Sequence, residues 1–183
     1  MKRLTLAFAL LLSACGGTQL RYELPEVAET AQIPVSYGSV EIRDVSLPTY
    51  AQQDIIYVED EDGALVGDTD LLWADDPQRA FTEGLAFRLA ALTRARVASE
   101  PWPFYENPDA RIEVRFSRAL PENTGRYRIA GQYFVASVDG ERRDTARRFD
   151  LSAPIVTPTS PAIAAAKAEV IDQLAQLIAR DGL

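Results

Sequence analysis

Residues 111–116 read Arg-Ile-Glu-Val-Arg-Phe, and this strict alternation decides the fold class. Ile112, Val114 and Phe116 are expected on one face and the charged residues on the other, as in a strand buried on one side. Residues 126–138 predict a longer, mostly apolar strand, and Asp139-Gly140 after it is typical of a hairpin turn. The arginine-rich residues 141–151 then return as its partner.

Two amphipathic helices are predicted around this hairpin. Asp76 and Pro77 are typical of a helix start, and apolar residues recur on one face until the helix ends near Arg96. Ser160-Pro161 begins a second helix, on whose polar side Lys167 is expected. Because each helix has one apolar stripe, both are predicted to pack on the same face of the sheet.

Shorter β-rich runs complete the pattern, at residues 20–24, 40–47, 54–59, 64–73 (one returning strand or two short ones) and 97–102. The predicted order is β-β-β-α-β-β-β-β-α. Runs of strands joined by hairpins, with two helices, indicate the α+β class. We therefore expect a mixed, mostly antiparallel sheet with two amphipathic helices packed on one face.

The N-terminus has the pattern of a bacterial lipoprotein signal. Basic Lys2 and Arg3 precede an apolar run, 4–12, that is far shorter than the roughly 20 residues of a membrane-spanning helix. Leu12-Ser13-Ala14-Cys15 matches the lipoprotein processing box. The sequence thus predicts a signal peptide at 1–14 and acylation of Cys15, with an ordinary secretory signal and an incidental cysteine as the alternative.

The mature chain is predicted to have two parts: lipidated Cys15 with a short tether and first strand (15–36), and a single α+β domain (37–183). Gly16, where Asp would favour inner-membrane retention, favours the outer membrane. Residues 16–104 carry 6 basic and 16 acidic side chains, a net charge of −10. Such a chain is a poor partner for nucleic acid, but its acidic half could face a basic protein.

The residue inventory restricts the chemistry. The chain has no histidine, and Cys15 is its single cysteine. This excludes Ser–His–Asp and Cys–His catalysis and nearly all imidazole or thiolate metal sites. No catalytic, cofactor-binding or metal-binding residue is therefore predicted. A Schiff-base or Ser–Lys role for Lys167, the sole lysine after the signal, would require its burial.

Three other features allow two interpretations each. The acidic turn 59–62 resembles part of a calcium loop, but its other positions do not fit, so a solvated hairpin tip is preferred. Four arginines either contact a partner or lipid headgroup or, as preferred, form the solvated face of an edge strand: Arg142, Arg143, Arg147 and Arg148. The aromatic residues Trp73, Trp102 and Phe104 are expected to pack in the core rather than line a ligand groove.

A series of short motifs runs along the mature chain. They are Arg21-Tyr22-Glu23-Leu24-Pro25, Val45-Ser46-Leu47-Pro48-Thr49-Tyr50, Leu72-Trp73-Ala74-Asp75, Phe87-Arg88-Leu89-Ala90, Glu100-Pro101-Trp102 and the terminal Leu177-Ile178-Ala179. With the lipoprotein signal in front, their order resembles the ABC-type transport auxiliary lipoproteins, the PqiC-like family. The chain departs from that family in its acidic turn and in Tyr133-Phe134, where a tryptophan is expected.

The resemblance implies a non-catalytic auxiliary component of an MCE-type ABC transport system for lipid trafficking and envelope integrity. Acyl chains on Cys15 would anchor it to the periplasmic face of the outer membrane. Its expected partners are a periplasm-spanning MCE-domain protein and the inner-membrane transporter, and a homo-oligomer stays open. Two alternatives are a periplasmic hydrolase with carboxylates about 5–9 Å apart and a lipid-binding carrier with an apolar cavity of several hundred Å³, on the order of known ligand sites.

Overall fold

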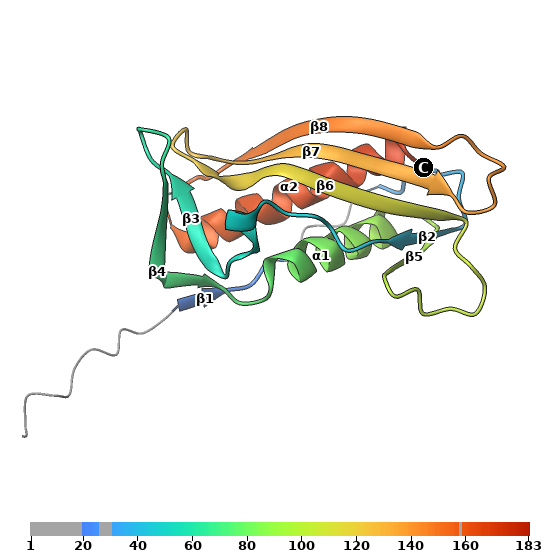
Figure 1. The fold of residues 1–183 in the computed structure, drawn as a ribbon, viewed down its shortest axis with the longest axis horizontal. Coiled ribbons are helices and arrows are strands. Elements are labelled where there is room, and N and C mark those ends of the chain that lie inside the picture. The colour runs from blue at the N-terminus through green and yellow to red at the C-terminus, as the bar shows by residue number, and fades with distance from the viewer. Residues whose placement is uncertain (1–19, 26–30, 158) are drawn as a thin grey trace, which may run out of the picture.

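The computed structural model describes residues 20–25, 31–157 and 159–183. Its elements are β1 (Leu20–Tyr22), β2 (Ser39–Ile42), the 3-10 helix η1 (Thr49–Gln52), β3 (Ile55–Glu59), β4 (Leu65–Trp73), α1 (Pro77–Leu92), β5 (Arg96–Ser99), β6 (Ala110–Glu122), β7 (Arg126–Ser137), β8 (Thr145–Pro154) and α2 (Ser160–Asp181) (Figure 1). Among these described residues, neither helix is long and apolar enough to cross a membrane.

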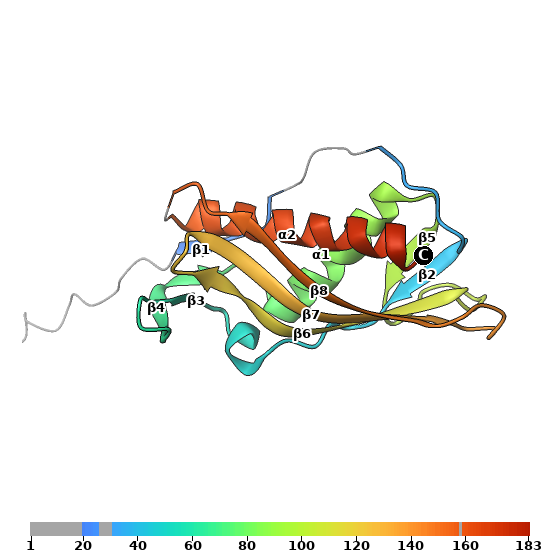
Figure 2. The same cartoon turned by 90° about the horizontal axis from the view of Figure 1, so that it is seen from above.

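The strands form two sheets rather than one. The larger has the order β5-β2-β6-β7-β8, in which β6, β7 and β8 are antiparallel and β2 is parallel to both of its neighbours. Both helices cover one face of this sheet, which gives two layers (Figure 2). The prediction of an α+β fold with two helices on one sheet face is confirmed.

The hairpin of β6 and β7 forms the centre of the fold. Ile112, Val114 and Phe116 are buried, as their alternation predicts. The Phe116 ring lies 4.8 Å from that of Phe81 on α1 and 5.5 Å from that of Phe149 on β8, so it joins the two layers. β6 then continues past its predicted end, because a bulge near Phe116 realigns it with β7.

Several elements are shorter than predicted: β1 ends at Tyr22, β5 ends at Ser99, and β2 and α1 also end early. β2 ends at Ile42 rather than Leu47. The N–H groups of Arg43 and Ser46 still donate to carbonyls of β6 (2.9 Å each), whereas the N–H of Val45 between them donates to Thr82 Oγ1 on α1 (3.2 Å). α1 ends at Leu92 rather than near residue 96. At that point the hydroxyl of the following threonine donates to the helix carbonyl four residues earlier (2.7 Å), which satisfies one of the terminal acceptors.

The turn at Asp139-Gly140 is wider than a two-residue hairpin. β7 ends at Ser137 and β8 begins at Thr145, so the return strand starts later than predicted. The Asp139 carboxylate accepts a hydrogen bond from the Ser137 hydroxyl, and the Ser137 N–H donates to Asp144 Oδ1 (3.2 Å). These side-chain bonds replace the backbone ladder at this end.

The smaller sheet, with the order β1-β4-β3, lies at one end of the long axis (Figure 1). β3 and β4 form an antiparallel hairpin, and β4 is one continuous strand. β1 adds in parallel to the end of β4, with Leu20 opposite Leu71. The first described strand is therefore fixed at this end of the molecule.

Candidate functional site

The N-terminal end of the domain is held close to the predicted lipid site. Cys15 itself lies outside the described residues, so its acylation stays a prediction. β1 begins at Leu20, five positions later, and the Arg21 guanidinium donates to the carbonyl of Trp73 (3.3 Å). An extended chain spans at most about 3.6 Å per residue. Acyl chains on Cys15 would thus keep this end within about 18 Å of a bilayer.

The acidic turn is a hairpin tip stabilised by its own backbone. Asp60 Oδ1 accepts the N–H groups of Asp62 (3.0 Å) and Ala64 (2.7 Å). Gly63 has a φ of +80°, which favours glycine. Within the described ranges, no group of three or more Asp or Glu side chains is arranged to hold a metal ion.

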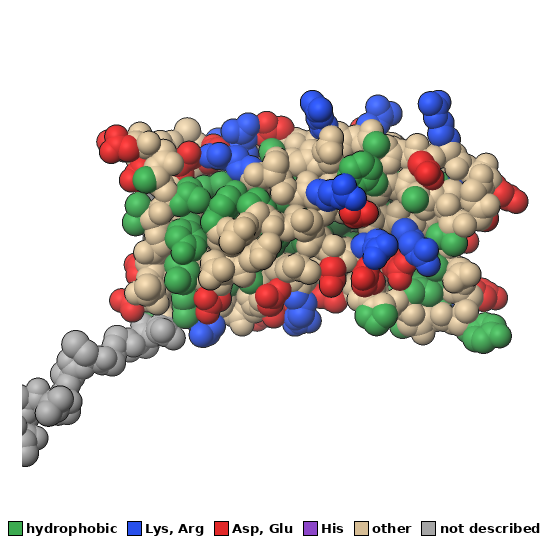
Figure 3. Space-filling model, in the orientation of Figure 1, with side chains coloured by type: hydrophobic (Ala, Val, Ile, Leu, Met, Phe, Trp, Pro, Cys, Tyr) green, Lys and Arg blue, Asp and Glu red, His purple; other side chains and the backbone are tan. Residues whose placement is uncertain are grey.

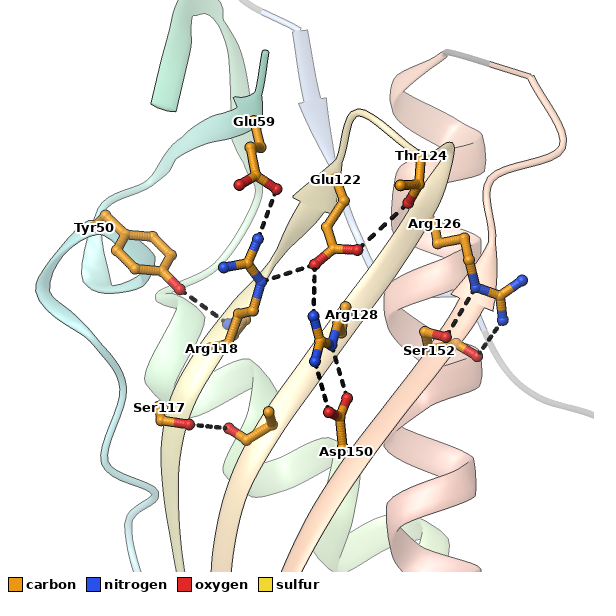
Figure 4. A network of polar contacts seen from close by, with 12 residues as sticks. Tyr50, Glu59, Ser117, Arg118, Glu122, Thr124, Arg126, Arg128, Asp150 and Ser152 are labelled. Carbon is orange, nitrogen blue, oxygen red and sulfur yellow. Dashed lines mark hydrogen bonds and ion pairs between the residues drawn. The ribbon is translucent and has the colours of Figure 1, made fainter. Parts of the chain in front are cut away.

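A cluster of ion pairs joins the two sheets in front of the strands (Figure 4). Arg118 on β6 contacts Glu59 on β3 (2.6 Å) and Glu122 on β6 (2.8 Å). Arg128 on β7 in turn bridges Glu122 (3.3 Å) and Asp150 on β8 (2.6 Å). The sequence offers little sign of this cluster, since Glu59 and Arg118 are 59 positions apart.

Asp150 in this cluster is poorly suited to act as a general acid. The hydrogen bond from Arg128 lowers the pKa of Asp150, which favours the ionised form. A general acid in glycoside hydrolysis needs the opposite, a carboxyl with a raised pKa. The cluster therefore supports a role in holding β3 against the larger sheet.

Lys167 is buried, so the prediction that it lies on the polar side of the second helix is wrong. The side chain is 1% exposed, because α2 packs at this point against β4 and the start of α1. Its Nζ lies 4.0 Å from the ring centroid of Trp73 and 4.6 Å from that of Phe81. Burial lowers the pKa of Lys167 from 10.5 to about 7, and nearby Asp75 and Asp76 oppose this shift.

Lys167 forms part of a solvent-open hollow of about 470 Å³, here called the Lys167 hollow. Its walls are residues 22–24 at the end of β1, residues 73–75 at the end of β4 and, on α1, Arg79, Ala80 and Glu83. α1 begins here: Asp76 caps the helix by accepting the Arg79 N–H (2.8 Å). The hollow therefore combines a buried amine, a helix start and a rim with charges of both signs.

A second cavity shares Lys167 but is much smaller. It lies among core side chains that include Tyr50, Trp73, Phe81 and Tyr127, and its volume is about 20 Å³. This is room for about one water molecule, and an acyl chain does not fit. The core cavity thus offers no support for the lipid-carrier interpretation.

The tryptophans and Phe104 differ in position. Trp73 is buried, as predicted. The expected core packing of Trp102 and Phe104 is wrong: they stack edge to face on each other (centroids 4.9 Å apart) in the loop between β5 and β6, and Phe104 is 42% exposed. The indole of Trp102 donates to the Glu106 carbonyl (2.6 Å), a loop contact that sequence spacing does not reveal.

Surface charge is unevenly distributed. Acidic side chains gather at the end of the molecule that carries the β3–β4 hairpin (Figure 3). Residues 44–78 contain no lysine or arginine. On β8, an edge strand of the larger sheet, Arg147 and Arg148 are exposed, as the edge-strand interpretation predicts. Arg142 lies over the Tyr37 ring (4.8 Å to the centroid).

These features define a class: a small two-layer α+β domain whose N-terminal strand is fixed at one end, close to a predicted lipid anchor. The chain belongs to the family of ABC-type transport auxiliary lipoprotein components, whose model matches residues 22–179. The resemblance inferred from the sequence motifs is thereby confirmed.

Solved structures support the same fold. An uncharacterized protein is similar with a TM-score of 0.72 and 17% identity, over 88% of this chain and 97% of its own. Protein XCC0632 from Xanthomonas campestris has a TM-score of 0.64 and 14% identity, over 87% and 93%. The comparison with curated proteins gives no match. At these identities the structural likeness concerns the fold alone.

Proposed function

We propose that this chain is an outer-membrane lipoprotein that serves an MCE-type ABC transport system in lipid trafficking and envelope integrity. It acts there as a non-catalytic auxiliary component. The observation that carries the proposal is the family match over residues 22–179, nearly the whole mature chain, behind a lipoprotein processing box at Cys15.

The chain's chemistry and geometry support a binding role. Without histidine or a second cysteine, the common nucleophilic triads are unavailable to it. The carboxylates of the ion-pair cluster are paired with arginine. The short distance from Cys15 to β1 would hold the domain at a membrane surface, where it meets a partner that crosses the periplasm.

Co-purification tests the proposal. The wild-type lipoprotein, extracted from native membranes in mild detergent, is expected to recover an MCE-domain protein and its transporter. Cys15→Ala is expected to leave the domain folded but to abolish membrane association. Recovery of no MCE protein, under conditions that preserve other envelope complexes, would contradict the role in transport. Unchanged membrane association of Cys15→Ala would contradict the lipid anchor.

A further inference from the structure

We propose that the Lys167 hollow binds a small zwitterion. An oxyanion of the ligand reaches the Lys167 ammonium, and a ligand ammonium rests on the acidic rim. This inference goes beyond the proposed function and holds with or without a transport partner.

The floor of the hollow offers a ligand a hydrogen-bond donor, the Lys167 ammonium. An ammonium has three N–H donors, yet within the described part of the chain the contacts of Lys167 are the faces of two aromatic rings. Those faces attract the cation but accept no conventional hydrogen bond. Because the hollow is open to solvent, an oxyanion that enters it would give this largely buried ammonium a charged acceptor in an environment of low dielectric.

The beginning of α1 adds to this preference. The N-terminal turn of a helix carries a partial positive charge and favours anions, and Arg79 and Ala80 of that turn line the hollow. The Arg79 guanidinium is already paired with Asp75 (3.0 Å). Lys167 is thus the cation that is left for a ligand oxyanion.

The carboxylates that line the hollow favour a positive group on the same ligand. Two carboxylates line the hollow: exposed Glu23, and Glu83 on α1, which accepts a hydrogen bond from the Ser99 hydroxyl (2.8 Å). Two such carboxylates would repel a simple anion. A ligand that also carries an ammonium removes that repulsion. A volume of about 470 Å³ is suitable for a headgroup-sized molecule.

Two sources supply this chemistry: the phosphoethanolamine headgroup of a lipid and a free amino-acid-type solute. The hollow adjoins β1, so the headgroup source would rest on the proposed anchoring at Cys15. The experiment below uses soluble probes and does not depend on that anchoring.

Lysine-selective isotope labelling of the mature lipoprotein in maltoside micelles provides the test, since Lys167 is the sole lysine after the signal peptide. Glycerophosphoethanolamine or glycine is titrated while the Lys167 side-chain resonance is followed by NMR. We expect a saturable shift and a higher titration midpoint with at least one of them, and the probe that binds more tightly identifies the source. Two probes are expected to bind at least about tenfold more weakly: glycerophosphate, which lacks the ammonium and carries additional negative charge near neutral pH, and ethanolamine, which lacks the oxyanion.

Variants separate ligand binding from general effects. Lys167→Met, which keeps the apolar contacts, should weaken binding of the zwitterion by about 10- to 100-fold in calorimetry. Glu23→Gln should weaken binding of the zwitterion but not binding of glycerophosphate. Arg94→Met, beyond the other end of α1, is the matched control and should change the binding of neither probe. The proposal is overturned if no probe shifts the resonance, if glycerophosphate binds as tightly as the zwitterion, or if Lys167→Met binds like wild type.

Discussion

Arg88 on α1 donates a hydrogen bond from Nε to Asp172 Oδ1 on α2 (2.7 Å), and both side chains are 7% exposed. This pair connects the two helices in the interior of the helical layer. Asp172 also accepts a hydrogen bond from Gln176 (2.8 Å). The two members of this buried ion pair lie 84 positions apart in the sequence.

Removal of one member of this pair should be costly. Asp172→Asn removes the carboxylate that accepts hydrogen bonds from Arg88 Nε and from Gln176, and we expect the free energy of unfolding to fall by about 1–3 kcal/mol. The double variant Arg88→Met/Asp172→Leu should recover much of that loss. Urea denaturation of both variants and of the wild type measures these differences. A loss below about 1 kcal/mol for Asp172→Asn would show that the pair is hydrated.

Lys167 should make stability depend on pH. Between pH 7 and 10.5 the unfolded chain binds this proton more tightly than the folded chain does, so the free energy of unfolding rises with pH over that interval. Below pH 7 both states are protonated, and the cost of burying the charge is complete. Lys167→Met should therefore be more stable than wild type at pH 6, by at most about 5 kcal/mol.

The same comparison at higher pH provides the control. The advantage of Lys167→Met over wild type should shrink steadily as the pH rises from 7 to 9. Urea denaturation of both proteins at each pH isolates this group, because all other titrating residues are shared. A difference that stays constant across this range would contradict the lowered pKa of Lys167.

Two glycines should respond to alanine in opposite directions. A Cβ at Gly84 on α1 would lie 3.5 Å from Ile171, an ordinary contact, so Gly84→Ala should raise the free energy of unfolding by up to about 1 kcal/mol. A Cβ at Gly131 would lie 2.1 Å from the backbone oxygen of Arg115. Gly131→Ala should therefore destabilise the protein by about 1–3 kcal/mol or more. Equal effects of the two changes in urea denaturation would contradict the close approach of β6 and β7.

Arg118 should control the attachment of the β3–β4 hairpin. Because its guanidinium is partly exposed, Arg118→Ala should cost only about 1 kcal/mol overall. Amide hydrogen exchange in β3 and β4 should nevertheless accelerate. Arg126→Ala, which loses contacts to Ser152 on β8 only, is the matched control. Similar exchange in both variants would exclude a connecting role for Arg118.

The sequence predicts the parts of this fold that depend on local periodicity. Alternation identifies β6, and the helical stripes identify both helices and the face on which they pack. Strand and helix ends are less predictable, since the residues beyond them make long-range bonds such as that of Val45 to Thr82. The arrangement of the two sheets also depends on long-range contacts, since Glu59 on β3 pairs with Arg118 on β6, 59 positions later.

The candidate site is predictable only in part. The processing box at Cys15 is a local motif, whereas burial of Lys167 depends on what α2 contacts. Residues around Lys167 are mostly alanine, and alanine gives no clear sign of which side of the helix is buried. The contacts from β4 and α1 create that face. The positions of Trp102 and Phe104 also depend on a tertiary contact, because the two rings stack on each other in a loop instead of packing in the core.

The most direct test of the account is the intact mass of the mature protein isolated from bacterial membranes. The account predicts a chain that starts at Cys15 and carries a diacylglyceryl group on sulfur and an acyl chain on the α-amine. A chain that starts at another residue, or one with a free thiol at position 15, would contradict it.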